Sequence, residues 1–177
     1  MYQVLIVPEF WSDEIREYLD AIGQLFYIGI WSCCERSGVF EVKFGELRRK
    51  IFPGNPSITN KQLETYYQIL REHKKIIEYK AQGRTLGWVK AYLKIQRRLQ
   101  NVPPPILPLP DWVAYMDFNE PGEQSRDKYK YVVLPYDFTV DPPERPSDLE
   151  IVAYLDRQRA EIVKRRRKKK GGGDLDG

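Results

Sequence analysis

The stretch from residue 58 to residue 71 constrains the fold most, because it marks where a helix starts and which side of it is buried. Thr59 and Gln62 have the spacing of a capping box, in which each side chain satisfies a backbone donor of the other residue. Ile58 and Leu63 occupy the positions of a hydrophobic staple around that cap. Apolar residues then recur at i, i+3, i+4 and i+7: Leu63, Tyr66, Tyr67 and Leu70. The sequence predicts an amphipathic helix here.

Two further helices are expected before it. Residues 14–34 form the first, and its apolar positions follow a helical rhythm: Ile15, Leu19, Ile22, Leu25, Phe26 and Ile30. Its second half is apolar nearly all round, which is typical of a buried helix. A short strand is expected at 39–42 and a short helix at 44–52, which the run Pro53-Gly54-Asn55-Pro56 ends.

A β-hairpin is expected directly after the capped helix. Ile77 and Tyr79 alternate on one strand, Leu86 and Trp88 on the other, and residues 81–83 supply a glycine-containing turn. The order helix, strand, helix, helix, hairpin is that of a winged helix-turn-helix. The predicted class is mainly α with a small β-hairpin (α+β), and residues 1–102 form the winged-helix domain.

The rest of the chain is expected to be less regular. Residues 91–99 fit one more short helix, and Pro103-Pro104-Pro105 begins an extended linker. Residues 103–146 are interpreted as a proline-rich, acidic linker or accessory segment, with a strand at 131–134. Ser147 and Glu150 form a second capping box that opens a basic helical tail over 147–177.

Charge is unevenly distributed along the chain. Residues 1–110 carry 16 Lys or Arg against 11 Asp or Glu, and residues 111–156 carry 4 against 11. Residues 157–177 carry 9 against 3. A basic head and a basic tail flanking an acidic middle indicate a polyanionic partner.

The residues expected to contact DNA fall into three groups. The capped helix would read base edges, because its outward side offers donors and acceptors that suit the major groove: Asn60, Lys61, Thr65, Gln68 and Arg71. The hairpin and the second helix would hold phosphates: Lys80, Gln82, Arg84, Arg48, Arg49 and Lys50. Seven consecutive cations in the tail would bind DNA without regard to sequence: Lys164, Arg165, Arg166, Arg167, Lys168, Lys169 and Lys170. The alternative interpretation is a set of solvated faces, and Glu64 and Glu72 on the capped helix would repel phosphate.

Catalysis, cofactors and metals are not expected. Cys33 and Cys34 are adjacent and read as small apolar residues of a core helix, while His73 is the only histidine. The longest apolar run, residues 25–31, is far shorter than the roughly 20 residues of a membrane span, so no membrane partner is expected. A weaker alternative is a metal-dependent nuclease, since Glu41-Val42-Lys43 matches half of such a motif, with Asp20 the nearest candidate for its aspartate.

Several stretches of the sequence resemble the winged-helix replication-initiation proteins of phages. They are Leu25-Phe26-Tyr27-Ile28-Gly29-Ile30-Trp31, Ser37-Gly38-Val39-Phe40, Leu47 with Ile51-Phe52-Pro53, Ile77-Glu78-Tyr79, Gly83, Leu86-Gly87-Trp88-Val89, Tyr92 and Gln96. The resemblance covers roughly residues 8–108, although Ile95 stands where the family often has histidine.

The resemblance implies the DNA-binding module of a replication initiator or replisome organiser, related in fold to DnaD-type primosomal proteins. It implies double-stranded DNA as the partner, with a replicative helicase or its loader as a further one, in the cytoplasm of a bacterial host. A homo-oligomer and the DNA sequence recognised are left open.

Two other classes of function fit the same fold. One is a transcriptional regulator. The other is a protein-interaction adaptor that docks through aromatics after the linker, which are expected either to be exposed for docking or to pack against the head domain: Trp112, Tyr129, Tyr131 and Tyr136. The acidic middle would, as a further hypothesis, compete with DNA for the basic tail.

Overall fold

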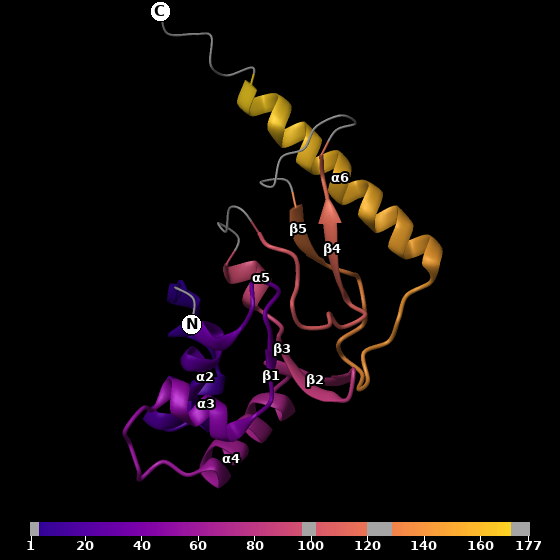
Figure 1. Ribbon diagram of the computed structural model, residues 1–177. Helices are drawn as coiled ribbons and strands as arrows, with labels where there is room; N and C mark the ends of the chain where they lie inside the picture. Colours follow the sequence, from indigo (N-terminus) through magenta and orange to yellow (C-terminus); the bar gives the residue numbers. More distant parts are fainter. Residues whose placement is uncertain (1–3, 97–101, 120–128, 171–177) are drawn as a thin grey trace, which may run out of the picture. The chain divides into compact units, whose positions relative to one another are not determined.

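The computed structural model describes residues 4–96, 102–119 and 129–170, apart from the side chains of 129, 163 and 165–170. Contacts divide the chain into two compact units, Met1–Pro110 and Asp111–Gly177, and each is described by itself (Figure 1). Within the described residues, no helix has both the length and the apolar content needed to cross a membrane.

The first unit mixes helices with one small antiparallel sheet, so the α+β class is confirmed. It begins with a 3₁₀ turn, η1 (Pro8–Phe10), and two helices, α1 (Ile15–Tyr18) and α2 (Ala21–Cys33). Strand β1 (Val39–Glu41) precedes α3 (Phe44–Ile51) and α4 (Asn60–Glu72). The hairpin β2 (Ile76–Ala81) and β3 (Arg84–Val89) leads into α5 (Tyr92–Ile95). The elements expected between residues 39 and 89 are therefore present in the expected order.

The single helix expected over 14–34 is wrong, because the chain breaks between α1 and α2. Leu19 has an extended backbone (φ −118°, ψ 129°), and the carboxylate of Asp20 caps α2 by accepting a hydrogen bond from the Gly23 amide at 2.8 Å. Aspartate is a strong N-cap, but the apolar rhythm runs through the break and conceals it. Leu25, expected in the apolar set of that helix, is 49% exposed.

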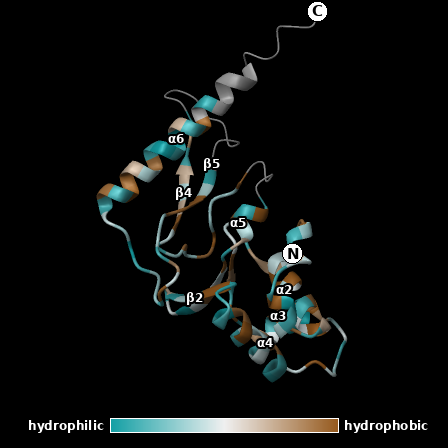
Figure 2. Cartoon of the chain, turned by 180° about the vertical axis from the view of Figure 1, so that it is seen from behind, coloured by the Kyte–Doolittle hydropathy of each residue, from teal (hydrophilic) through white to brown (hydrophobic). Residues whose placement is uncertain are grey.

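The core of the first unit forms where α2 packs against α3 and α4. The side chains of Phe26, Ile30, Leu63, Tyr67 and Leu70 are each no more than 2% exposed. Brown, hydrophobic positions accordingly gather on α2 in Figure 2. Cys34, as expected, is buried at the end of α2, and neither it nor Cys33 forms a disulfide.

The sheet has the strand order β1-β3-β2, so the strand that follows α2 is joined to the hairpin. Val39 and Ile77 both pair with Trp88, whose indole N–H donates to the Ser37 carbonyl at 3.1 Å. The hairpin closes at the pair Ala81 and Arg84 through a two-residue turn, with φ 51° at Gln82 and 72° at Gly83. Positive φ at both positions is the signature of a type I′ turn, whose twist matches that of the strands.

The segment after α5 is held against the first unit. The Glu35 carboxylate accepts hydrogen bonds from the amides of Ile106 at 3.2 Å and Leu107 at 3.0 Å, and the Tyr79 hydroxyl donates to the Pro108 carbonyl at 2.6 Å. Burial raises the pKa of Glu35, although these two bonds act in the opposite direction. The stretch expected to be an extended linker is thus fastened as far as Pro108. The helix expected over 91–99 is described only as α5, since residues 97–101 lie outside the described ranges.

The second unit contains a hairpin and a long helix. Strand β4 (Val113–Asp117) pairs antiparallel with β5 (Tyr129–Val133), and α6 (Asp148–Lys170) follows. The sequence predicted a strand near β5 but none at β4. Trp112 and Tyr136, expected to be exposed docking aromatics, are 7% and 9% exposed and pack edge to face with ring centroids 6.2 Å apart. That expectation is wrong for these two residues, because each aromatic ring packs against another ring of the same unit.

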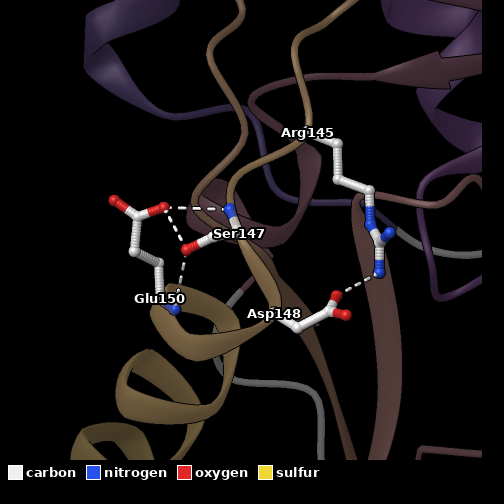
Figure 3. A network of polar contacts seen from close by, with 4 residues as sticks. All are labelled: Arg145, Ser147, Asp148 and Glu150. Carbon is white, nitrogen blue, oxygen red and sulfur yellow. Dashed lines mark hydrogen bonds and ion pairs between the residues drawn. The ribbon is translucent and has the colours of Figure 1, made fainter.

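The start of α6 is the second capping box, formed in full (Figure 3). The Glu150 amide donates to the Ser147 hydroxyl oxygen at 3.3 Å, and the Ser147 amide donates back to the Glu150 carboxylate at 2.9 Å. The Ser147 hydroxyl also donates to that carboxylate at 2.7 Å, which lowers the pKa of Glu150. Arg145 pairs with Asp148 at 2.7 Å in the same turn.

Candidate nucleic-acid interface

The N-terminus of α4 is fixed by only one half of the predicted capping box. The Gln62 amide donates to the Thr59 hydroxyl at 3.2 Å, but the Gln62 side chain donates to the Tyr66 hydroxyl at 2.9 Å instead of returning to Thr59. Tyr66 in turn donates to the Asp20 carboxylate at 2.7 Å, and this bond is the main reason that the pKa of Asp20 is lowered. The reciprocal bond is lost because Tyr66, which Asp20 at the N-cap of α2 holds in place, accepts the hydrogen bond from the Gln62 side chain.

The outward side of α4 carries the expected polar residues. Asn60, Lys61, Thr65 and Gln68 are all exposed. The Thr65 hydroxyl donates to the Lys61 carbonyl at 3.1 Å, so its oxygen faces solvent as an acceptor only. Glu64 is exposed on the same helix. This surface therefore offers hydrogen-bonding groups with little net charge.

Arg71 is less exposed than the other α4 residues that were expected to contact base edges. It is half-buried and connects α4 to the hairpin: its guanidinium lies 3.7 Å from the Glu78 carboxylate on β2 and donates to the Gln68 side-chain oxygen at 3.1 Å. Glu78 also accepts from the Tyr67 hydroxyl at 2.9 Å. Because a guanidinium can only donate, the amide oxygen of Gln68 must face Arg71, which leaves the Gln68 N–H groups for an external acceptor.

The hairpin tip presents the three residues expected there. Lys80, Gln82 and Arg84 are exposed on or beside the two-residue turn. The tight turn and the contact from Arg71 to Glu78 hold this tip in a defined position relative to α4. The tip thus offers two cationic side chains and one side-chain amide on a two-residue turn.

Helix α3 divides its three cations between two roles. Arg49 and Lys50 are exposed, whereas Arg48 is half-buried and donates to the Ile58 carbonyl at 3.2 Å, so it holds the loop between α3 and α4.

Sequence reasoning overlooked Gly45. A Cβ built there would lie 3.8 Å from the Asn60 amide nitrogen and 3.9 Å from the Arg49 guanidinium, so the starts of α3 and α4 adjoin. A glycine within a helix costs about 1 kcal/mol relative to alanine, and that cost is the signal that could have drawn attention to it.

The basic tail forms the last turns of α6. Its backbone is helical through Lys170, and Lys164 is exposed, while the side chains of 165–170 lie outside the described residues. The expected contacts of Arg165, Arg166, Arg167, Lys168, Lys169 and Lys170 therefore remain sequence-based predictions.

The residues of the nuclease hypothesis are engaged in other interactions. Lys43 pairs with Glu41 at 3.1 Å and with Glu46 at 3.6 Å, and the bond to Glu41 is the main reason that its pKa is raised. Asp20 caps α2 and binds Tyr66. In the described part of the chain, His, Cys, Asp and Glu form no group of three or more that could hold a metal ion.

Comparison of the chain with protein-family models, curated proteins and solved structures found no match.

Proposed function

We propose that residues 1–102 form a winged-helix module that binds double-stranded DNA, in a protein of phage or prophage replication initiation. The observation that carries the proposal is the connection of two exposed polar surfaces by one set of contacts between α4 and β2. The outward side of α4 and the tip of the β2–β3 hairpin are tied through Tyr67, Arg71 and Glu78. The replication context rests on the sequence resemblance alone.

Helix α4 suits the major groove, which admits one helix and displays a distinct pattern of donors and acceptors for each base pair. In this proposal Asn60, Lys61 and Gln68 contact base edges, with Gln68 acting as a donor. Arg71 acts as a positioning residue because both of its contacts lie within the protein. Lys80 and Arg84 hold phosphates beside the groove, as do Arg49 and Lys50 from α3.

Charge sets the expected balance between affinity and specificity. The outer side of α4 combines Lys61 with Glu64, and Glu72 is exposed at its end, so this helix adds little electrostatic attraction. Affinity would come mainly from the cations of α3, the hairpin tip and the tail. It would fall as salt rises, because the release of counterions from DNA on binding is less favourable at a higher salt concentration. Sequence preference would come from α4.

The test is a fluorescence-anisotropy titration of the full chain with double-stranded, single-stranded and random-sequence DNA at two salt concentrations. One variant replaces residues 164–170 with glutamine and should weaken binding to all sequences alike while flattening the salt dependence. A second variant, Gln68→Ala, should reduce the preference among duplex sequences with little change in that slope. Arg157→Gln, a single cation earlier on α6, is the matched control for a loss of charge in the tail helix.

Two results would refute the proposal. If the neutralised tail abolishes all binding, the first unit is not a DNA-binding module, and the adaptor hypothesis takes its place. If Gln68→Ala and the tail variant change binding in the same way, α4 does not read bases.

A further inference from the structure

One side of α6 is left uncovered and carries hydrophobic residues. Leu149 is 84% exposed and Val152 is 56% exposed, whereas Ile151, Tyr154 and Leu155 on the other side are half-buried. In Figure 2, hydrophobic and hydrophilic positions alternate along this helix. Ile151, Tyr154 and Leu155 are partly covered, so the side that carries Leu149 and Val152 is the one available to another molecule.

The uncovered side has the spacing of a coiled coil. Leu149, Val152, Asp156 and Arg159 follow one another at intervals of three, four and three residues, and all four are exposed. The helical backbone extends the series by four residues to Val163. Intervals that alternate between three and four keep one stripe facing a partner helix.

Asp156 and Arg159 occupy the middle of this stripe. Neither side chain forms an ion pair or a hydrogen bond within the described residues. Charged residues at such positions weaken a coiled coil but dictate how its helices align. A partner must therefore present a cation to Asp156 and an anion to Arg159.

We propose that the partner is α6 of a second copy of this chain, packed antiparallel. In the register that places Asp156 opposite the partner's Arg159, Arg159 also lies opposite the partner's Asp156. The same register places Val152 opposite the partner's Val163. The pairing is a closed twofold contact in which both copies use the same surface.

Charge along the whole helix selects the antiparallel arrangement. Residues 148–156 carry three acidic residues and no cation, while residues 157–170 carry nine cations and one acidic residue. Antiparallel pairing along a helix of about 34 Å sets each acidic half beside a basic half. Parallel pairing would place Asp156 beside Asp156 and two cationic runs side by side, where like charges repel.

A second copy fits this surface better than DNA does. DNA attracts the basic half of α6 but repels the acidic half, and it offers no apolar surface to Leu149 and Val152. Because this register gives the stripe only two apolar pairs, Val152 with the partner's Val163 and the reverse, the dimer is expected to be weak and sensitive to salt.

Sedimentation of the full chain over a wide range of concentrations tests the proposal. Asp156→Arg and Arg159→Asp should each weaken self-association by about tenfold or more, because each change creates two like-charge contacts. The two changes together should restore it, since they exchange the charges of both pairs. Glu161→Arg and Arg157→Asp make the same changes of charge off the stripe and should have little effect. Circular dichroism verifies that each variant keeps its helix.

Disulfide trapping determines the direction of the helices. Val152→Cys with Val163→Cys should form intermolecular disulfides, whereas Val152→Cys alone should form none above the level of the unchanged chain, which contains Cys33 and Cys34. A chain that stays monomeric, a failure of the double charge exchange to restore association, or efficient trapping by Val152→Cys alone would overturn the proposal. These readouts contain no DNA, so their outcome is independent of the function proposed for the first unit.

Discussion

The contact between α2 and α3 at Gly29 predicts a substitution whose effect on stability changes sign with its neighbour. A Cβ at Gly29 would lie 2.4 Å from Ile51 Cγ2, 2.9 Å from Cγ1 and 3.0 Å from Cδ1. Carbon atoms in good contact are about 3.5–4.0 Å apart, so Ile51 would have to move. Ile51 ends α3, and its packing against Gly29 therefore helps to place Arg49 and Lys50.

The magnitude follows from two opposing contributions. Alanine in place of glycine stabilises a helix by about 1 kcal/mol, while overpacking a core costs about 1–3 kcal/mol. Gly29→Ala should therefore lower the free energy of unfolding by about 1 kcal/mol, and by up to about 2 kcal/mol, in the unchanged chain. In an Ile51→Ala background the three clashing carbons are absent, so the same change should raise the free energy of unfolding by up to about 1 kcal/mol.

Urea unfolding of the four proteins, followed by tryptophan fluorescence, gives the coupling energy of this double-mutant cycle. We expect a coupling of about 2 kcal/mol, with Ile51→Ala alone as the baseline. Gly45→Ala is the control, because a Cβ there has neighbours no closer than 3.8 Å, and it should stabilise both backgrounds alike. If Gly29→Ala has the same effect with and without the Ile51 side chain, the close approach of α2 and α3 is incorrect.

Three further predictions concern single hydrogen bonds or backbone geometry. Tyr66→Phe should lower the free energy of unfolding by about 1 kcal/mol at neutral pH. Because the pKa of Asp20 is lowered in the folded state, this stabilisation is complete above the ordinary pKa of aspartate and is lost as the pH falls through the pKa of Asp20 in the folded protein. Urea titrations at several pH values measure the difference in free energy of unfolding between the two proteins, and a difference that does not vary with pH would contradict this prediction. Ser147→Ala should cost the start of α6 about 1 kcal/mol, seen as faster amide exchange in its first turn, whereas Glu150→Gln should retain most of the cap. Gly83→Ala should lower stability by about 1–2 kcal/mol, because φ at this residue is 72°. Among the described residues, none except the two chain neighbours would have an atom within 4 Å of the new Cβ, so crowding is not the cause. Thermal unfolding that shows no loss would argue against the type I′ turn.

Local signals in the sequence were sufficient where neighbouring residues alone decide the structure. The cap at Ser147 and Glu150 formed as predicted, since both partners lie on one exposed turn and bind each other there. The hairpin formed about its glycine because positive φ is cheapest there. The polar side of α4 was also predictable, as the apolar spacing fixes which side of a helix is buried.

Some features of the candidate site could not be predicted, because the deciding partner lies far away in the sequence. The Gln62 side chain binds Tyr66 instead of Thr59, because Asp20, 46 residues earlier, accepts a hydrogen bond from the Tyr66 hydroxyl and holds it in place. Arg71 pairs with Glu78 on the hairpin, although its position along α4 predicted a side chain that points outward to contact DNA bases.

The sequence by itself determined the α+β class, the order of elements from residue 39 to 89, the turn between β2 and β3, the capping box at Ser147 and Glu150, and the division of charge among head, middle and tail. Each depends on contacts between residues a few positions apart or on composition. Only the tertiary structure decided that α1 and α2 are separate helices, that β4 exists, and that Trp112 and Tyr136 are buried. In each case the outcome depends on which surfaces meet after folding, and local periodicity carries no information about that choice.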